Sequence, residues 1–196
     1  MYEQELKNYH MLNELAEPGG IVIFGGSADR ELPLCELKQA FSIDQGLYNR
    51  SLPELSVRDA AELFTVCAAP LHPETVLLHI GEADKGWATE NPDEFDRLYR
   101  NLIDRIREQN KKCRIAVLSL ANRKDDPVTA AINRHLKYFA ESERCEYGDL
   151  TSKRVWNPKE TKEVTAFVQA MGSVRSRRTV YDLVKILFCR DMAQSE

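Results

Sequence analysis

Ser27 is the first residue in the sequence whose type and surroundings suggest chemistry. It follows Gly25-Gly26 directly, and these come after an apolar run at residues 21–24. Two glycines let the backbone turn tightly and approach a ligand. Three interpretations compete for this loop: Ser27 is a nucleophile, the loop cradles a phosphate, or the serine caps the helix that follows. From the loop alone, the helix cap is the commonest outcome.

Two known glycine motifs do not fit this loop. A dinucleotide-binding fingerprint needs a third glycine, and none follows. The nucleophile elbow of α/β-hydrolases needs a glycine two residues after the serine, where this chain has Asp29. The loop must therefore be interpreted together with the rest of the chain.

Polar residues also follow two later strand-like stretches. Asn49 and Glu54 bracket the segment after the second stretch, and Gly81 and Asp84 follow the apolar run at residues 75–80. In open parallel sheets, ligands bind beyond the carboxyl ends of the strands. If the three stretches are parallel strands, their loops meet at one edge of the sheet and form a single site.

The order of the elements supports this arrangement. Uninterrupted apolar runs, typical of strands buried on both faces, alternate with amphipathic helical patterns. This alternation predicts an α/β fold: a three-layer α/β/α sandwich with a parallel sheet of about five strands. Strands are expected at 21–24, 46–49, 75–80, 114–120 and 145–150, and helices at 3–16, 30–41, 57–68, 93–109, 127–139, 158–171 and 179–189.

Three of these strands, at 21–24, 75–80 and 114–120, are expected to be parallel neighbours, with 21–24 central beside 75–80. The chain has 196 residues, which suits one domain. We expect that domain to span residues 1–172. A basic helical extension at 173–196 follows, and its apolar side is a candidate surface for a homodimer.

Composition excludes several classes of protein. With 27 Lys and Arg against 31 Asp and Glu, the formal net charge is −4, which disfavours nucleic acid as a partner. No apolar run is long enough to span a membrane, and the acidic N-terminus is unlike a secretory signal. The cysteines form no CxxC pair, which predicts buried free thiols in a cytoplasmic protein. The scattered histidines predict no metal site, and no cofactor is expected.

The loops together resemble those of the GDSL/SGNH hydrolase family. The family's serine lies in a Gly-Asp-Ser motif, which Gly25-Gly26-Ser27 resembles with a glycine in place of the aspartate. The second family block, Asn-x-(Gly or Ser)-x-x-Gly, resembles the segment from Asn49 to Glu54, with Glu54 at the position of the last glycine. The resemblance covers most of the chain and implies a flavodoxin-like architecture.

The remaining two blocks depart further from the family pattern. The third block is Gly-x-Asn-Asp, and Ala83 replaces its asparagine in the segment that begins at Gly81. The last block, Asp-x-x-His before the final helix, aligns with Ser152 and Val155, and Trp156 follows. Neither Ser152 nor Val155 can act as a base or orient one, and a serine without a base is a poor nucleophile.

The resemblance implies roles for individual residues. Ser27 would attack an ester or acyl carbonyl, and the backbone N–H groups of Ser27 and Glu54 would hold the oxyanion. Ser27, Glu54 and Ala83 should therefore lie together, with Val155 or Trp156 facing them. The residues expected to bind the substrate are Gly26, Asn49, Gly81, Asp84 and Trp156.

A replacement for the missing base has several candidates. His79 lies near the active end of its strand, although a core histidine is the commoner outcome. Asp29, Glu54, Glu82 and Asp84 could act as acid and base or bind a cation, or they could be solvated and cap turns. The tryptophans Trp87 and Trp156 are candidates to line the pocket or to pack in the core.

Three functions remain open on this basis. The first is a GDSL-like serine esterase or acylhydrolase that acts on a small ester or acyl substrate and has weak or no activity. The second is a non-catalytic ligand-binding or scaffold domain on the same fold. The third is a flavodoxin-like domain that binds phosphate or a nucleotide.

Overall fold

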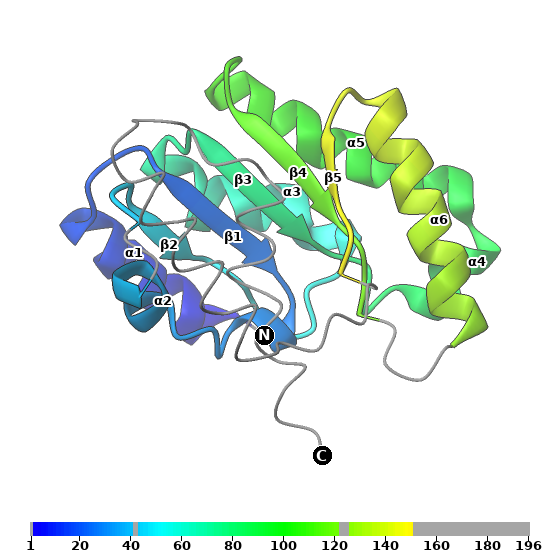
Figure 1. Ribbon diagram of the computed structural model, residues 1–196, viewed down its shortest axis with the longest axis horizontal. Helices are drawn as coiled ribbons and strands as arrows, with labels where there is room; N and C mark the ends of the chain where they lie inside the picture. Colours follow the sequence, from blue (N-terminus) through cyan, green and yellow to red (C-terminus); the bar gives the residue numbers. More distant parts are fainter. Residues whose placement is uncertain (1, 41–42, 122–125, 151–196) are drawn as a thin grey trace.

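The computed structural model describes residues 2–40, 43–121 and 126–150. These ranges contain a five-stranded parallel sheet with the strand order β2-β1-β3-β4-β5 (Figure 1). The predicted α/β class is confirmed. The strands are β1 (Ile21–Gly25), β2 (Leu47–Asn49), β3 (Thr75–His79), β4 (Arg114–Leu118) and β5 (Glu146–Gly148).

The central strands are buried on both faces, as their uninterrupted apolar sequences predict. All five residues of β1 are buried, and so are four of the five in β3 and in β4. The expected parallel neighbours are confirmed, but the middle strand is β3, which pairs with β1 on one side and with β4 on the other. The pairing places Gly25 opposite His79 at the carboxyl end.

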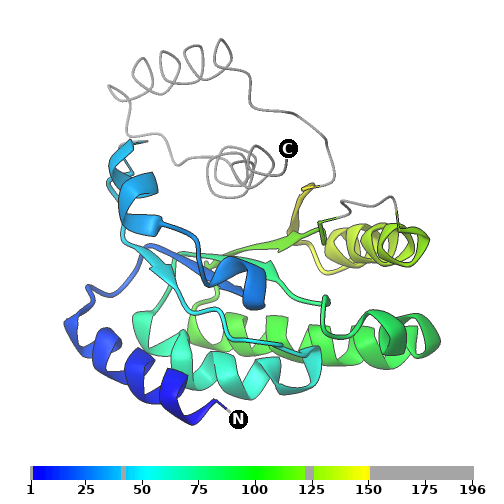
Figure 2. The same ribbon diagram turned by 90° about the horizontal axis from the view of Figure 1, so that it is seen from below.

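Helices cover both faces of the sheet. Figure 2 shows α1, α3 and α5 on one side of the sheet and α2 on the other. The apolar side chains of α6 belong to the same core as those of α3 and α5, and α6 packs against β4 and β5. The helices are α1 (Glu3–Leu15), α2 (Leu34–Ala40), α3 (Val57–Cys67), α4 (Lys85–Glu90), α5 (Pro92–Gln109) and α6 (Pro127–Ser142), with short 3-10 turns η1 (Ser27–Asp29) and η2 (Ala69–Leu71).

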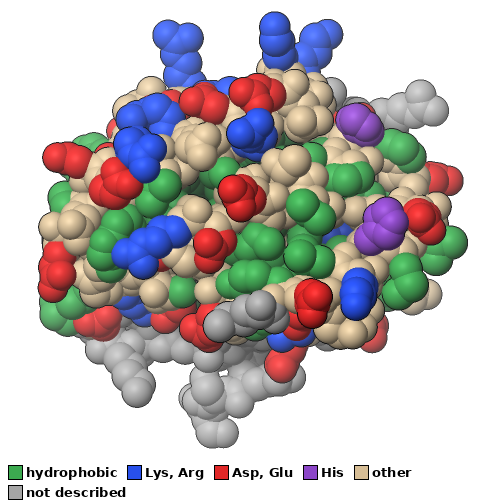
Figure 3. All heavy atoms as spheres, turned by 180° about the vertical axis from the view of Figure 1, so that it is seen from behind, with side chains coloured by type: hydrophobic (Ala, Val, Ile, Leu, Met, Phe, Trp, Pro, Cys, Tyr) green, Lys and Arg blue, Asp and Glu red, His purple; other side chains and the backbone are tan. Residues whose placement is uncertain are grey.

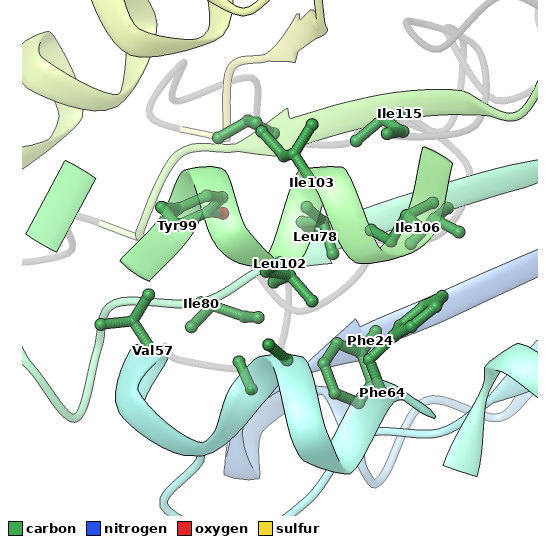
Figure 4. Close-up of a cluster of buried hydrophobic side chains, with 14 of the residues drawn as sticks. Phe24, Val57, Phe64, Leu78, Ile80, Tyr99, Leu102, Ile103, Ile106 and Ile115 are labelled. Carbon is green, nitrogen blue, oxygen red and sulfur yellow. The ribbon is translucent and has the colours of Figure 1, made fainter. Parts of the chain in front are cut away.

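The larger core lies between the sheet and α3, α5 and α6 (Figure 4). Phe24 of β1 meets Phe64 of α3 edge to face, with ring centroids 5.4 Å apart. Leu102 and Ile106 of α5 are almost completely buried against the sheet. Burial of a side chain of this size contributes about 2 kcal/mol, so this face anchors the strands whose ends carry the site.

Two helices differ from the sequence expectation. The helix expected at 30–41 begins only at Leu34, because Pro33 disfavours helical backbone in the residue before it. Between the strand at 75–80 and the helix at 93–109, where the sequence predicts no helix, the chain forms α4, whose glycine and threonine have low helix propensity. Buried Ala88 lies in α4, which packs against α5 and α6, so tertiary packing stabilises this helix.

The far side of the molecule carries a mixed surface. Figure 3 shows acidic and basic side chains interspersed there, with apolar side chains between them. None of the helices in the described ranges is long and apolar enough to cross a bilayer. The expected boundary at residue 172 and the basic extension at 173–196 lie outside the described residues.

Candidate active site

A cleft of about 560 Å³ lies at the carboxyl edge of the sheet. It brings together the turn after β1, the loop before α3, the end of β3 with the loop after it, and the start of α6. This is where open parallel sheets bind ligands. Its lining residues are Gly26, Ser27, Ala28, Asp29, Glu54, Leu55, His79, Gly81, Glu82, Ala83, Lys85, Ala121, Asp126 and Thr129.

Ser27 is exposed in the cleft and is held by one residue, Glu54. Its hydroxyl donates to Glu54 Oε1 at 3.2 Å, and the Glu54 N–H donates to Ser27 Oγ at 3.0 Å. The structure therefore brings Ser27 and Glu54 together, and Ala83 lines the same cleft. The hydroxyl proton points at the carboxylate of Glu54, which is one of the candidate acid–base groups in the sequence and also the residue expected to supply a backbone N–H.

The backbone of Glu54 has a conformation that favours glycine. Its φ is +49°, in the left-handed region where a Cβ is strained. The family pattern has a glycine at this position, so the chain keeps the turn that the pattern requires while carrying a side chain there. Pro53, the residue directly before Glu54, is compatible with this turn. The resulting geometry aims both the N–H and the carboxylate of Glu54 at Ser27.

Asp29 and His79 form a buried pair beneath the cleft. His79 Nδ1 lies 2.8 Å from Asp29 Oδ1 and 3.0 Å from Oδ2, and the side chains are only 11% and 3% exposed. An ionised carboxylate only accepts, so Nδ1 carries a proton. The carboxylate lies over Gly25, where a Cβ would come within 1.9 Å of Asp29 Oδ2.

This environment favours the charged imidazolium. Burial by itself lowers the pKa of His79, but the charge and hydrogen bond of Asp29 raise it. The charge of Glu82 and a hydrogen bond to the backbone of Ser119 act in the same direction, so the pKa of His79 is raised overall. Through its contact with Asp29, the ring ties η1 to β3.

Two residues expected to bind substrate serve the scaffold and are not among those that line the cleft. Asn49 donates to the backbone carbonyl of Asp29 at 2.6 Å and accepts from the Ser51 N–H at 3.0 Å, so it fixes η1 to the end of β2. Asp84 is buried and accepts from Ser56 Oγ at 2.6 Å and from the Val57 N–H at 2.9 Å. It satisfies the start of α3 rather than a ligand.

The other predicted residues divide between the cleft and positions beyond it. Gly26 and Gly81 line the cleft, and Gly81 has a φ of +126° that suits glycine. The Arg58 guanidinium stacks on Trp87, with the guanidinium carbon 4.0 Å from the centre of the Trp87 ring. Ser152, Val155 and Trp156 lie outside the described residues.

Neither metal nor thiol chemistry has a basis in the part of the chain that the structure describes. Within it, no group of three or more His, Cys, Asp or Glu side chains is arranged to hold a metal ion. Burial raises the pKa of Cys67 to about 11 and that of Cys113 to about 12. The expectation of buried thiols is wrong for Cys35, which is exposed because it faces outward from the short helix α2.

Comparison with solved structures identifies the fold of the chain. The fold is similar to that of a GDSL-like lipase from Bacteroides thetaiotaomicron, at a TM-score of 0.57 and 16% identity over 86% of this chain and 97% of that one. It is also similar to an acetylxylan esterase from Geobacillus stearothermophilus, at 0.53 and 15% over 82% and 96%. The chain has the fold of the GDSL/SGNH hydrolases.

A third structure with this fold is the acetyl xylan esterase AlAXEase, with a TM-score of 0.56 and 15% identity over 82% of this chain and 87% of that one. No protein-family model matches the sequence, and no curated protein sequence matches it either. The GDSL/SGNH fold therefore persists here at low sequence identity, which fits the block-by-block departures.

One partnership escaped the sequence analysis. Asp29 and His79 were separate candidates, and nothing in their spacing of fifty residues pairs them. The strand register is the feature that pairs them. Gly25 lies opposite His79, and because it has no side chain, the Asp29 carboxylate fits above the strand and reaches the imidazole. That register is set by tertiary pairing and not by local pattern.

Proposed function

We propose that this protein is a serine ester hydrolase of the GDSL/SGNH type with low activity, acting on a small ester or acyl substrate. The observation that carries the proposal is the exposed Ser27 hydroxyl, which is bonded in both directions to Glu54 at the mouth of the cleft. A nucleophile needs an acceptor for its proton, and one is in place.

The donors for an oxyanion also lie near Ser27. In the tetrahedral adduct, the serine oxygen and the oxyanion are bonded to the same carbon, so we propose that an N–H which holds the serine oxygen at rest turns to the oxyanion as it forms. The Glu54 N–H, 3.0 Å from Ser27 Oγ, meets this condition. The family asparagine is replaced by Ala83, and loss of a single oxyanion donor typically costs about 100- to 1,000-fold in rate.

The charges of the cleft argue for a neutral substrate over a phosphate or nucleotide. The carboxylates of Asp29, Glu54, Glu82 and Asp126 line it, while the basic groups in the lining are Lys85 and His79. Lys85 is paired with Glu82 at 2.6 Å, and His79 with Asp29. The carboxylates in the lining outnumber the basic groups, so a polyanion would meet net negative charge.

The second candidate is a non-catalytic binding domain on the same fold. The observation in its favour is that His79, an imidazole of the cleft, is held in a buried pair with Asp29. A carboxylate is a weaker base than an imidazole, so a site that depends on Glu54 has a poor base, which favours a binding role.

Covalent labelling separates the two candidates. The full-length protein is incubated with an alkyl fluorophosphonate, and the adduct is located by mass spectrometry. Slow labelling at Ser27, abolished in Ser27→Ala and retained in the matched variant Ser142→Ala on the exposed end of α6, supports the hydrolase. Absence of a Ser27 adduct, or equal labelling of Ser27→Ala, contradicts the hydrolase and favours the binding domain.

A further inference from the structure

We infer that the Glu54 carboxylate is the catalytic base of this site, so that Ser27 and Glu54 form a dyad that works without histidine. The inference rests on the proposed function, because it assigns the proton acceptor for the same nucleophile. Its basis is the hydrogen bond from the Ser27 hydroxyl to Glu54 Oε1 at 3.2 Å. A general base must lie within hydrogen-bond reach of the proton that it takes, directly or through one water, and Glu54 meets this condition directly.

The backbone of Glu54 fixes this contact. The N–H of Glu54 holds Ser27 Oγ at 3.0 Å, and the side chain of the same residue curls back to the hydroxyl. Tyr2 donates to the Glu54 carbonyl at 3.3 Å, which anchors the third polar group of that residue. The left-handed φ of +49° is what turns the N–H and the carboxylate toward Ser27.

The competing base is already occupied. Asp29 holds His79 Nδ1, and the ring is 11% exposed, whereas Glu54 and Ser27 are both exposed to an incoming substrate. A base that is open to solvent can also take a proton from the water that hydrolyses an acyl-enzyme. The charged groups that line the cleft around Glu54 are Asp29, His79, Glu82, Lys85 and Asp126.

The chemical steps balance with this one carboxylate. Ser27 Oγ bonds to the ester carbon while its proton passes to Glu54 Oε1, and the carbonyl electrons move onto the oxyanion. Collapse of the adduct breaks the bond to the alcohol, which takes the proton from Glu54. Water then attacks the acyl group and gives its proton to Glu54, and Ser27 Oγ leaves with that proton as the acid is released.

The test is the second-order rate constant for labelling of Ser27 by the alkyl fluorophosphonate. Glu54→Gln keeps the size and the backbone N–H but removes the basic oxygen, so the rate constant should fall about 100-fold. Glu54→Asp, which shortens the side chain, should lose less, about tenfold. The matched control is Glu62→Gln, an exposed charge on α3 that should leave the rate unchanged.

Two further variants distinguish the ways in which the inference can fail. If Glu54→Gln labels as fast as wild type while Ser27→Ala does not label, the dyad is wrong but the hydrolase stands. A 100-fold loss in Glu82→Gln or in folded His79→Gln, with Glu54→Gln unaffected, assigns the base to that residue. If wild type forms no Ser27 adduct, both the dyad and the proposed function are overturned. Urea unfolding of each variant checks that it is folded.

Discussion

Two polar pairs lie side by side at the end of β1, and they differ in burial. Asp29 and His79 are 3% and 11% exposed and join η1 to β3. Ser27 and Glu54 are exposed and join the same turn to the loop before α3. Buried charges are costly to separate, whereas an exposed hydrogen bond exchanges readily with water. The comparison indicates that the buried pair holds the structure and that the exposed pair is available for chemistry.

The comparison also bears on our assignment of the base to Glu54 and not to the histidine of the cleft. An Asp–His contact orients the imidazole in serine hydrolases, and here the same contact is present. It lies below the surface, however, where burial lowers the pKa of His79 but the charge and hydrogen bond of Asp29 raise it overall. The orientation of a histidine by an aspartate is therefore insufficient evidence for a catalytic base.

The largest effect is expected from crowding the buried pair. In Gly25→Ala, the new Cβ would lie 1.9 Å from Asp29 Oδ2 and 2.9 Å from the His79 carbonyl, so the carboxylate must move away. We expect a loss of about 4 kcal/mol in the free energy of unfolding, measured by urea denaturation. The neighbouring Gly26→Ala meets nothing within 4 Å and should cost less than about 1 kcal/mol. Equal losses would show that Asp29 is not held over Gly25.

A slightly smaller effect is expected from removing the charge of the pair. Asp29→Asn leaves His79 without its carboxylate and should cost about 3 kcal/mol in unfolding free energy near pH 6. Because the pKa of His79 is raised above 6.5 in the fold, its proton stabilises the protein fully below that pH. This contribution is lost as the pH rises through the raised pKa.

The corresponding measurement is urea unfolding over a pH series. Wild type should lose stability relative to Asp29→Asn as the pH increases from about 6.5, so that the difference between the two narrows. A difference that stays constant or widens with pH would mean that His79 is neutral in the fold.

The smallest effect concerns the exposed pair. Glu54→Gly should raise the unfolding free energy by about 1 kcal/mol, because glycine adopts the left-handed φ of +49° without strain. Glu54→Ala retains a Cβ and should change stability by less than about 0.5 kcal/mol. Thermal unfolding of the two variants compares them directly. Destabilisation by Glu54→Gly would indicate that the Glu54 side chain stabilises the turn. Backbone strain at this residue would then not lower the stability of the protein.

The sequence predicted the sheet because its strongest strands are apolar over their whole length. β1 and β3 need no tertiary information to be recognised, since alternation is absent from both. Helix α4 could not be predicted, because buried Ala88 and its packing partners stabilise it and its own composition does not. The apolar spacing predicts a start at residue 30 for α2, but Pro33 disfavours helical backbone in the residue before it, so the helix begins at Leu34.

The candidate site was predictable in position and less so in chemistry. The convergence of Ser27, Glu54 and Ala83 follows from parallel strands and their loops. Asn49 and Asp84 hold the backbone of other segments, and this could not be predicted. It depends on which backbone groups lack a partner in the helices and strands and therefore bind a side chain. The bond from Ser27 to the Glu54 side chain depends on a backbone conformation that sequence pattern alone does not reveal.

The most direct test of the division between the two pairs is the pH dependence of Ser27 labelling by the alkyl fluorophosphonate. Carboxylates take up protons mainly below about pH 5, and histidines near about pH 6.5. With Glu54 as the base, the pH dependence of wild type should be retained in folded His79→Gln, and Glu54→Gln should label slowly at every pH between about 6 and about 8. A rate constant that falls steadily between about pH 8 and pH 6, and does so equally in Glu54→Gln, would contradict the account and place the base on His79.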